Sequence, residues 1–227
     1  MDKLELAKLL FENGQKYENK YGDYKQAVEW YQKAAELGLA AAQNYLGIMY
    51  AQGRGVEPNY SEAIKWFRAA AEQGDAEAQS NLGKMYLGQN NIEAMKWIRA
   101  AANQGSVQAQ YNLGIMYLQG LGVEQDDNEA AKWIRIAADN GYISAQINLG
   151  IMHIEGRGVK QSDAEAAKLF RAAAEQGDAQ AQFYLGKILI IGKGFKNDFD
   201  EGVKWIRAAA NQGHEEAIEI LKKIEEE

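Results

Sequence analysis

The 227-residue sequence contains no cysteine and a single proline. Without cysteine the chain can form neither a disulfide nor a thiolate metal site, which excludes the small secreted domains that disulfides stabilise. No segment rich in serine and proline separates one part of the chain from another. We therefore expect one continuous domain rather than several domains joined by linkers.

The sequence also lacks long apolar runs and an excess of basic residues. No stretch of about 18 apolar residues occurs, and the first residues, MDKLELAKLLFENG, contain no apolar segment typical of a signal peptide. We expect a cytoplasmic protein with no membrane insertion, although a mature secreted form or an effector exported by another route would have the same sequence. The net charge of -7 disfavours a nucleic-acid partner.

The sequence is dominated by an internal repeat. A Leu-Gly pair occurs at residues 46–47, 82–83, 113–114, 149–150 and 185–186, so the spacings are 36, 31, 36 and 36 residues. A second glycine register has the same spacing, at Gly38, Gly74, Gly105, Gly141, Gly177 and Gly213. All five tryptophans share a third register, at Trp30, Trp66, Trp97, Trp133 and Trp205. The three registers agree, including the single short step, which establishes the repeat.

Each repeat is predicted to form two helices. In residues 40–52, the apolar positions follow one helical face, and Gly53 is placed for a left-handed cap. The second helix is expected to begin after an N-cap residue at Asp23, Asn59, Asn90, Asp126, Ser162 or Asp198. Because Glu or Gln stands three residues after each cap, we expect a capping box in every repeat.

Residues 42–74, AQNYLGIMYAQGRGVEPNYSEAIKWFRAAAEQG, resemble the Sel-one-like repeat, a relative of the tetratricopeptide repeat. The resemblance implies an all-α fold, a right-handed superhelical solenoid of antiparallel helix pairs, and a bacterial source. We expect repeats at about 3–38, 39–74, 75–105, 106–141, 142–177 and 178–213, with a capping helix at 214–227.

Two repeats depart from the pattern. The first is predicted to contain a helix over residues 4 to about 21, in which Leu10 has the register of Leu46 and Phe11 replaces the glycine. This irregularity is typical of a terminal repeat, which covers one side of the stack and faces water on the other. The short repeat, 75–105, lacks five residues of the loop between its helices.

No pattern in the sequence indicates catalysis, a metal site or a cofactor. His153 has the register of Tyr50, which predicts a packed ring, and His214 has an N-cap register. Gly-x-Gly loops such as residues 53–55 lack the Lys-Ser/Thr of a phosphate-binding loop, so we interpret them as turns with glycine at positive φ. The regular spacing of the tryptophans favours packing over ligand stacking.

Positions that vary between repeats are the candidates for partner binding. By resemblance to tetratricopeptide repeats, the first helix of each pair lines the concave face of the solenoid. The partner-binding residues predicted on that face are Lys84, Tyr111, Ile115, Leu118, Ile147, Ile151, Ile154, Phe183, Lys187 and Ile190. Most of them form an apolar strip, which usually marks an interaction site. Alternatively, neighbouring first helices bury the strip against one another.

These observations predict a non-enzymatic scaffold that binds a peptide or helix of a partner protein, as a monomer or weak homodimer. One alternative is a cell-wall-related or β-lactam-hydrolysing enzyme, an activity attributed to some relatives. Against it, none of the few serines lies in a Ser-x-x-Lys motif. A second alternative is a structural protein that associates with itself through the strip.

Overall fold

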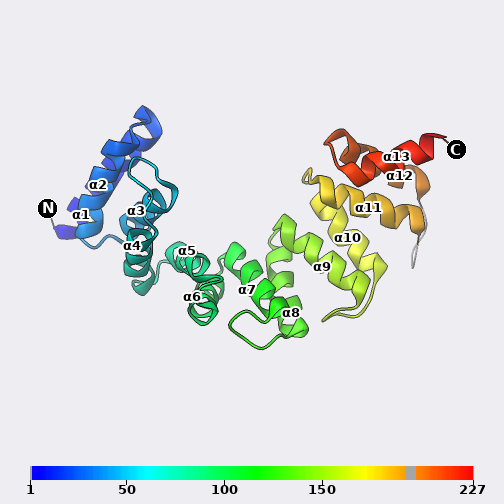
Figure 1. Ribbon diagram of the computed structural model, residues 1–227, viewed down its shortest axis with the longest axis horizontal. Coiled ribbons are helices and arrows are strands. Elements are labelled where there is room, and N and C mark those ends of the chain that lie inside the picture. The colour runs from blue at the N-terminus through cyan, green and yellow to red at the C-terminus, as the bar shows by residue number, and fades with distance from the viewer. Residues whose placement is uncertain (1, 193–197, 227) are drawn as a thin grey trace. The chain divides into compact units, whose positions relative to one another are not determined.

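A computed structural model describes residues 2–192 and 198–226. All regular structure in this part of the chain is helical, as predicted, and it forms an α/α solenoid of helix pairs (Figure 1). The helices are Lys3–Lys16 (α1), Tyr24–Glu36 (α2), Ala40–Gln52 (α3), Tyr60–Glu72 (α4), Ala76–Tyr86 (α5), Asn91–Asn103 (α6), Val107–Gln119 (α7), Asp127–Asp139 (α8), Ile143–Glu155 (α9), Asp163–Ala174 (α10), Ala179–Ile191 (α11), Phe199–Asn211 (α12) and Glu215–Glu226 (α13). We call the first helix of each pair (α1, α3, α5, α7, α9 and α11) an A helix and the second a B helix.

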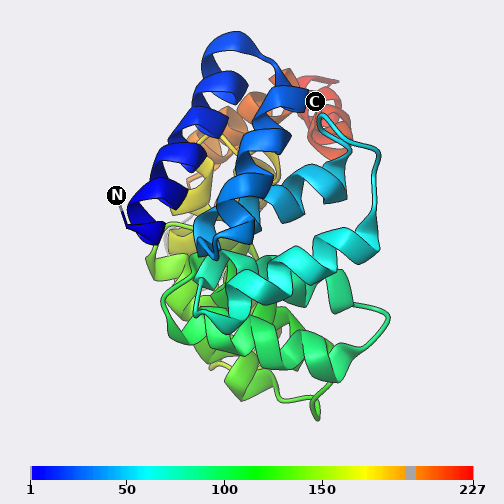
Figure 2. The ribbon, with the colours of Figure 1, turned by 90° about the vertical axis from the view of Figure 1, so that its left-hand side faces the viewer.

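The contacts divide the chain into two units, which are described separately. The N-terminal half ends at Ala109 and the C-terminal half begins at Gln110, within α7. In the turned view of Figure 2, α1 and α2 of the N-terminal half face the viewer and lie side by side in opposite directions. The single continuous domain expected from the sequence stays a prediction.

The predicted N-caps are confirmed, whereas the predicted capping boxes are wrong. Each cap side chain accepts a hydrogen bond from the backbone N–H three residues later. The backbone N–H of the cap, however, donates to a carbonyl near the end of the A helix: Asn59 to Tyr50 at 2.9 Å and Ser162 to His153 at 2.9 Å. Helix C-termini have carbonyls without helical partners, and the returning chain brings the cap against one of them. Within the described residues, Asp2 and Glu5 of α1 form the one complete capping box.

The short repeat keeps this hydrogen bond despite its deletion. The N–H of Asn90 donates to the carbonyl of Tyr86 at 2.8 Å, and Tyr86 has the register of Tyr50. The cap and its acceptor are four residues apart here and nine apart at Asn59. The five missing residues therefore come entirely from the loop between these two bonded groups.

The glycine of each Leu-Gly pair is the point of closest approach between the two helices of a repeat. A Cβ added at Gly47 would lie 2.6 Å from the ring of Phe67, and one at Gly150 would lie 2.5 Å from the ring of Phe170. The large residue at the register of Phe67 and Phe170 is almost fully buried in every repeat. The tryptophan just before it is half-buried in most repeats and 8% exposed at Trp97.

The register predicted for the first repeat is wrong. Gly14, and not Phe11, lies at the helix contact, because a Cβ on Gly14 would be 2.5 Å from the ring of Tyr31. Gly14 and Tyr31 are 17 residues apart, compared with 20 for Gly47 and Phe67. The shorter connection contains a π-helix, Tyr17–Tyr21, that directly follows α1. A fixed period of 36 residues therefore misplaces α1 by three residues.

A buried amide links adjacent repeats. In the N-terminal half, the Gln43 amide donates to the carbonyl of Ala35 in the preceding repeat at 3.1 Å, and its oxygen accepts from Gln73 at 2.7 Å. Gln79 bonds to the carbonyl of Ala71 in the same way. In the C-terminal half, the equivalent residues with this role are Gln146 and Gln182. Burial makes these hydrogen bonds costly to lose, so they connect each repeat firmly to the previous one.

The Gly-Arg-Gly loops also contact the preceding repeat. Gly55 has φ of 75°, and a Cβ there would clash with the carbonyl oxygen of Tyr24 at the start of α2. Arg54 in the same loop forms a salt bridge with Glu18 at 3.1 Å, and Glu18 accepts a 2.6 Å hydrogen bond from the buried Tyr31 hydroxyl. The positive φ predicted for this glycine is confirmed, and the loop serves packing between repeats.

The C-terminal half has an equivalent loop contact. Gly158 has φ of 66° and lies against the carbonyl of Asp127, and Arg157 forms a 2.8 Å salt bridge with the carboxylate of the same residue. This salt bridge holds the pKa of the Asp127 carboxyl below its usual value. The predicted turn at residues 192–194 lies mostly outside the described residues; Gly192 itself has φ of 66°.

Both histidines have the structural roles predicted for them. His153 is buried, with one ring nitrogen 3.2 Å from Arg135 and the other 3.1 Å from the carbonyl of Lys160. The Nδ1 atom of His214 accepts a hydrogen bond from the N–H of Ala217 at 3.4 Å, as an N-cap does. The helix that His214 caps, α13, packs against α12 as the predicted capping helix.

Candidate partner-binding surface on the A helices

In the N-terminal half, neighbouring A helices meet through polar side chains. Asn44 is 2% exposed, and its side-chain oxygen accepts a 3.1 Å hydrogen bond from Asn81 of the next A helix. Ser80 has the register of Asn44 and is 4% exposed. Lys84 is half-buried, and burial lowers the pKa of its ammonium, an effect that the charge of Glu77 partly opposes.

The same register in the C-terminal half holds Tyr111, Ile147 and Phe183. The Tyr111 hydroxyl accepts a 2.9 Å hydrogen bond from Asn148 of the next A helix, and burial raises its pKa. Its ring lies 5.1 Å from that of Tyr142. Residues at this register therefore form contacts between adjacent A helices. The alternative interpretation of the apolar strip expected such contacts at all of its positions.

Two residues of the predicted strip are covered by the last helices. Phe183 is 4% exposed, and its ring stacks on that of His214 with centroids 4.5 Å apart. Ile190 packs against Gly202 of α12, where an added Cβ would be 2.7 Å from its Cγ1 atom. The prediction that Phe183 binds a partner directly is therefore wrong, because the segment that begins at His214 buries the Phe183 side chain in the core.

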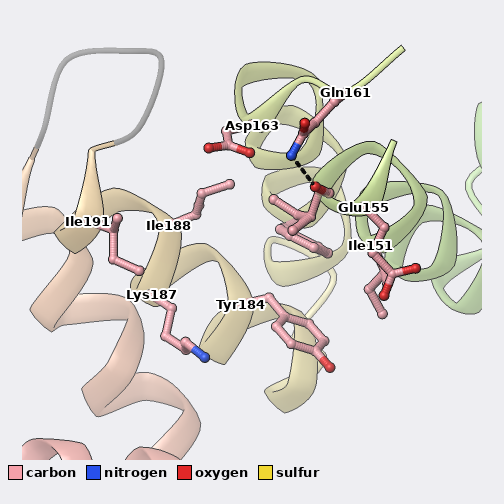
Figure 3. A pocket seen from close by; sticks show the side chains of 10 residues that line it. Ile151, Glu155, Gln161, Asp163, Tyr184, Lys187, Ile188 and Ile191 are labelled. Carbon is pink, nitrogen blue, oxygen red and sulfur yellow. Dashed lines mark hydrogen bonds between the residues drawn. The ribbon is translucent and has the colours of Figure 1, made fainter. Parts of the chain in front are cut away.

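Three other predicted residues surround a cavity of about 450 Å³ (Figure 3). Ile151 and Ile154 of α9 and Lys187 of α11 lie around it. Ile115 and Leu118 are half-buried on α7 and do not line this cavity, nor does Lys84 of the N-terminal half. The other apolar and aromatic lining residues are Phe170, Tyr184, Ile188 and Ile191.

Sequence reasoning did not select Phe170, Tyr184 and Ile188 as site residues. Tyr184 and Ile188 have the registers of Tyr45 and Met49, and Met49 is buried in the core of its own repeat. Periodicity assigns such residues to the core and carries no signal for a hollow beside them.

The rim of the cavity is polar and charged. Lys187 is exposed, and its Nζ atom lies 5.3 Å from the centroid of the Phe183 ring. Glu155, Gln161 and Asp163 line the α9–α10 side, where the Gln161 amide donates to the carbonyl of Ile154 at 2.8 Å. The combination of apolar walls and a charged rim suits a side chain with an apolar body next to a charge.

Within the described residues, no group of three or more His, Asp and Glu side chains is placed to hold a metal ion. In the same part of the chain, no helix has both the length and the apolar character needed to span a bilayer.

Tandem helix pairs joined by inter-repeat amides define an α-helical repeat protein of the tetratricopeptide-like class. A family model described as "Sel1 repeat" matches residues 4–39, 40–75, 76–106, 107–142, 143–178 and 179–214. The chain therefore belongs to the Sel1 repeat family, and the resemblance seen in the sequence is confirmed. Members of this family commonly mediate protein–protein interaction, and the fold is typically non-enzymatic.

Solved structures of bacterial proteins resemble this chain closely. The structure of c5321, a protective antigen of uropathogenic Escherichia coli strains with an SLR fold, is 39% identical with a TM-score of 0.90, over 95% of this chain and 48% of c5321. This chain thus spans about half the length of c5321. A Sel1 repeat protein from Oxalobacter formigenes is 31% identical with a TM-score of 0.79, over 91% of this chain and 86% of that protein.

A more distant similarity supports the fold alone. Immunity protein Pa5087 from Pseudomonas aeruginosa is 19% identical with a TM-score of 0.55, over 92% of this chain and 83% of that protein. None of the curated proteins compared with the chain matches it.

Proposed function

We propose that this protein is a non-enzymatic interaction scaffold that binds a peptide or helix of a partner protein. The binding surface is the A-helix face of the C-terminal half. The observation that carries the proposal is the cavity between α9, α10 and α11, where apolar walls open beside an exposed lysine. Ile191 in its wall is 56% exposed, which is costly for a large apolar side chain unless a partner covers it.

The proposed surface contains Ile151, Ile154 and Lys187 at its centre, with Ile115 and Leu118 as further candidates on α7. Tyr111, Ile147, Phe183 and Ile190 support it by holding neighbouring helices in position. The face on which these residues lie is the one that the tetratricopeptide resemblance predicts to be concave.

Affinity capture from cells of the source organism, with three forms of the protein, tests the proposal. The forms are the wild type, Ile151→Asp and Ile48→Asp. Ile48 has the same register as Ile151 and is also half-buried, but it lies in the N-terminal half. We expect partner proteins that the wild type and Ile48→Asp retain and that Ile151→Asp loses. Thermal melts by circular dichroism verify that both variants remain folded.

Two results would contradict the proposal. One is an identical set of captured proteins for all three folded forms. The other is self-association: light scattering at several concentrations would show a dimer in the wild type that Ile151→Asp abolishes, so the occupant would be a second copy of the chain.

A further inference from the structure

The rim of the cavity carries opposite charges on its two sides. Lys187 comes from α11, whereas Glu155 ends α9 and Asp163 begins α10. In the view of Figure 3, Lys187 and Asp163 lie on opposite sides of Ile188. Within the described part of the chain, none of these three residues forms a salt bridge. The cavity is therefore flanked by a lysine on one side and two carboxylates on the other, and Glu155 also interacts electrostatically with Arg157.

The lysine on α11 is notable because of its register. The equivalent positions in the other A helices with this register are Ile48, Lys84, Ile115 and Ile151. Lys84 is half-buried and has the nearby charge of Glu77. Lys187 is exposed at the mouth of an apolar cavity, and its Nζ atom lies near the face of the Phe183 ring. A cation beside apolar walls favours an anion that is attached to an apolar group.

The cavity also has a size and an opening that suit a side chain of a longer segment. Its volume of about 450 Å³ lies within the range of about 300–1,000 Å³ that ligand sites have. Small-molecule sites bury about 70–90% of the ligand surface. Here Ile191 in the wall is 56% exposed, so a small molecule would stay partly in water. A side chain attached to a peptide backbone that passes over the opening would cover this wall.

We propose that the partner segment has a fixed charge polarity, an inference that rests on the function proposed above. One apolar side chain of the segment enters the cavity, and an aspartate or glutamate close to it in sequence pairs with Lys187. A basic residue on the other side of the apolar anchor faces Glu155 and Asp163. The charges thus set the direction in which the segment crosses the C-terminal half.

Selection from a displayed library of random peptides tests this polarity. The library is selected on the wild type, on Lys187→Glu and on Lys84→Glu, which changes the same register in the N-terminal half. We expect the wild type to enrich peptides with a large apolar residue within four positions of an acidic residue. Lys187→Glu should lose the acidic preference and favour a basic residue there, whereas Lys84→Glu should select the wild-type motif.

Binding measurements on one selected peptide sharpen the test. By fluorescence anisotropy, Lys187→Glu should weaken binding of the acidic peptide at least tenfold. Replacing the acidic residue of the peptide by lysine should restore much of the affinity for Lys187→Glu and weaken binding to the wild type. The double variant Glu155→Lys and Lys187→Glu should prefer peptides with the reversed order of charges.

The possible failures are distinguishable. If Ile151→Asp abolishes partner capture but Lys187→Glu selects the wild-type motif, the charge polarity is wrong and the proposed function stands. If Lys84→Glu has the same effect as Lys187→Glu, the overall charge acts instead of the local pair, which overturns the inference. The inference is also overturned if none of the folded forms enriches a peptide.

Discussion

The A-helix faces of the two halves are built from the same registers but have different chemistry. In the N-terminal half, Asn44 and Asn81 join neighbouring helices by a partly buried amide pair. In the C-terminal half, Tyr111, Ile147 and Phe183 fill that register, and a cavity lies beside Ile151. The same register thus provides a polar contact in one half and apolar and aromatic contacts beside a cavity in the other. The repeat fixes the backbone, and the binding surface proposed above uses residues that the repeat leaves variable.

The largest effect should come from a change that the two halves share. The two variants are Gly83→Val and Gly186→Val. A Cβ at Gly83 would lie 3.2 Å from the Ala94 carbonyl oxygen, and one at Gly186 would lie 2.9 Å from the Gly202 carbonyl oxygen. Backbone atoms cannot move aside easily, so we expect each variant to lose about 3 kcal/mol of unfolding free energy in urea titrations. Ser61→Val, at an exposed helical position, controls for the helix propensity of valine. Wild-type stability of either glycine variant would contradict the close contact.

A somewhat smaller loss is expected when the amide link between repeats is removed. Gln43→Leu in the N-terminal half and Gln182→Leu in the C-terminal half each remove two hydrogen bonds, one to a carbonyl of the preceding repeat and one from a second glutamine. An intramolecular hydrogen bond contributes about 0.5–1.5 kcal/mol net, so the loss of two should cost about 2 kcal/mol in both halves. Urea titration measures it, with the exposed Gln52→Leu as the matched control. A loss in one half only would show that the link is not a general feature of the repeat.

A small gain in stability is expected at one polar residue of the N-terminal half. Among the residues that the structure describes, the buried Ser80 hydroxyl finds no hydrogen-bond partner. Removing it in Ser80→Ala should raise the unfolding free energy by up to about 1 kcal/mol, because the buried hydroxyl loses its hydration on folding. Ser144→Ala, at an exposed position on α9, should change little. A clear destabilisation by Ser80→Ala would show that this hydroxyl has a favourable contact.

The smallest effect concerns the half-buried Lys84 of the N-terminal half. Burial lowers the pKa of Lys84 in the folded state. The unfolded chain therefore holds more protons than the folded chain as the pH approaches the ordinary lysine pKa of about 10.4. Stability from this group must rise as the pH increases through the lowered pKa. We expect urea midpoints of the wild type to rise slightly in this alkaline range relative to Lys84→Met. Parallel curves for Lys84→Met and the wild type would contradict the burial effect.

Local patterns in the sequence were enough to predict the helix pairs. The cap at Asn59 depends on its own side chain and the backbone three residues later, and α3 begins and ends where its periodicity predicted. The failures occurred where a distant group intervened. The reciprocal half of the capping box is wrong because the N–H of Asn59 reaches Tyr50 instead. The register of α1 is wrong because a fixed period does not describe a shorter connection.

The repeat period and the helix pairs follow from the sequence alone, because they depend on short-range geometry that recurs in each repeat. Only the tertiary structure decided which apolar positions of the A helices are open. Phe183 and Ile151 both belong to the predicted strip, yet α13 covers the first, and the second lines a cavity. Exposure depends on side chains contributed by other helices, and no periodicity within one helix contains that information.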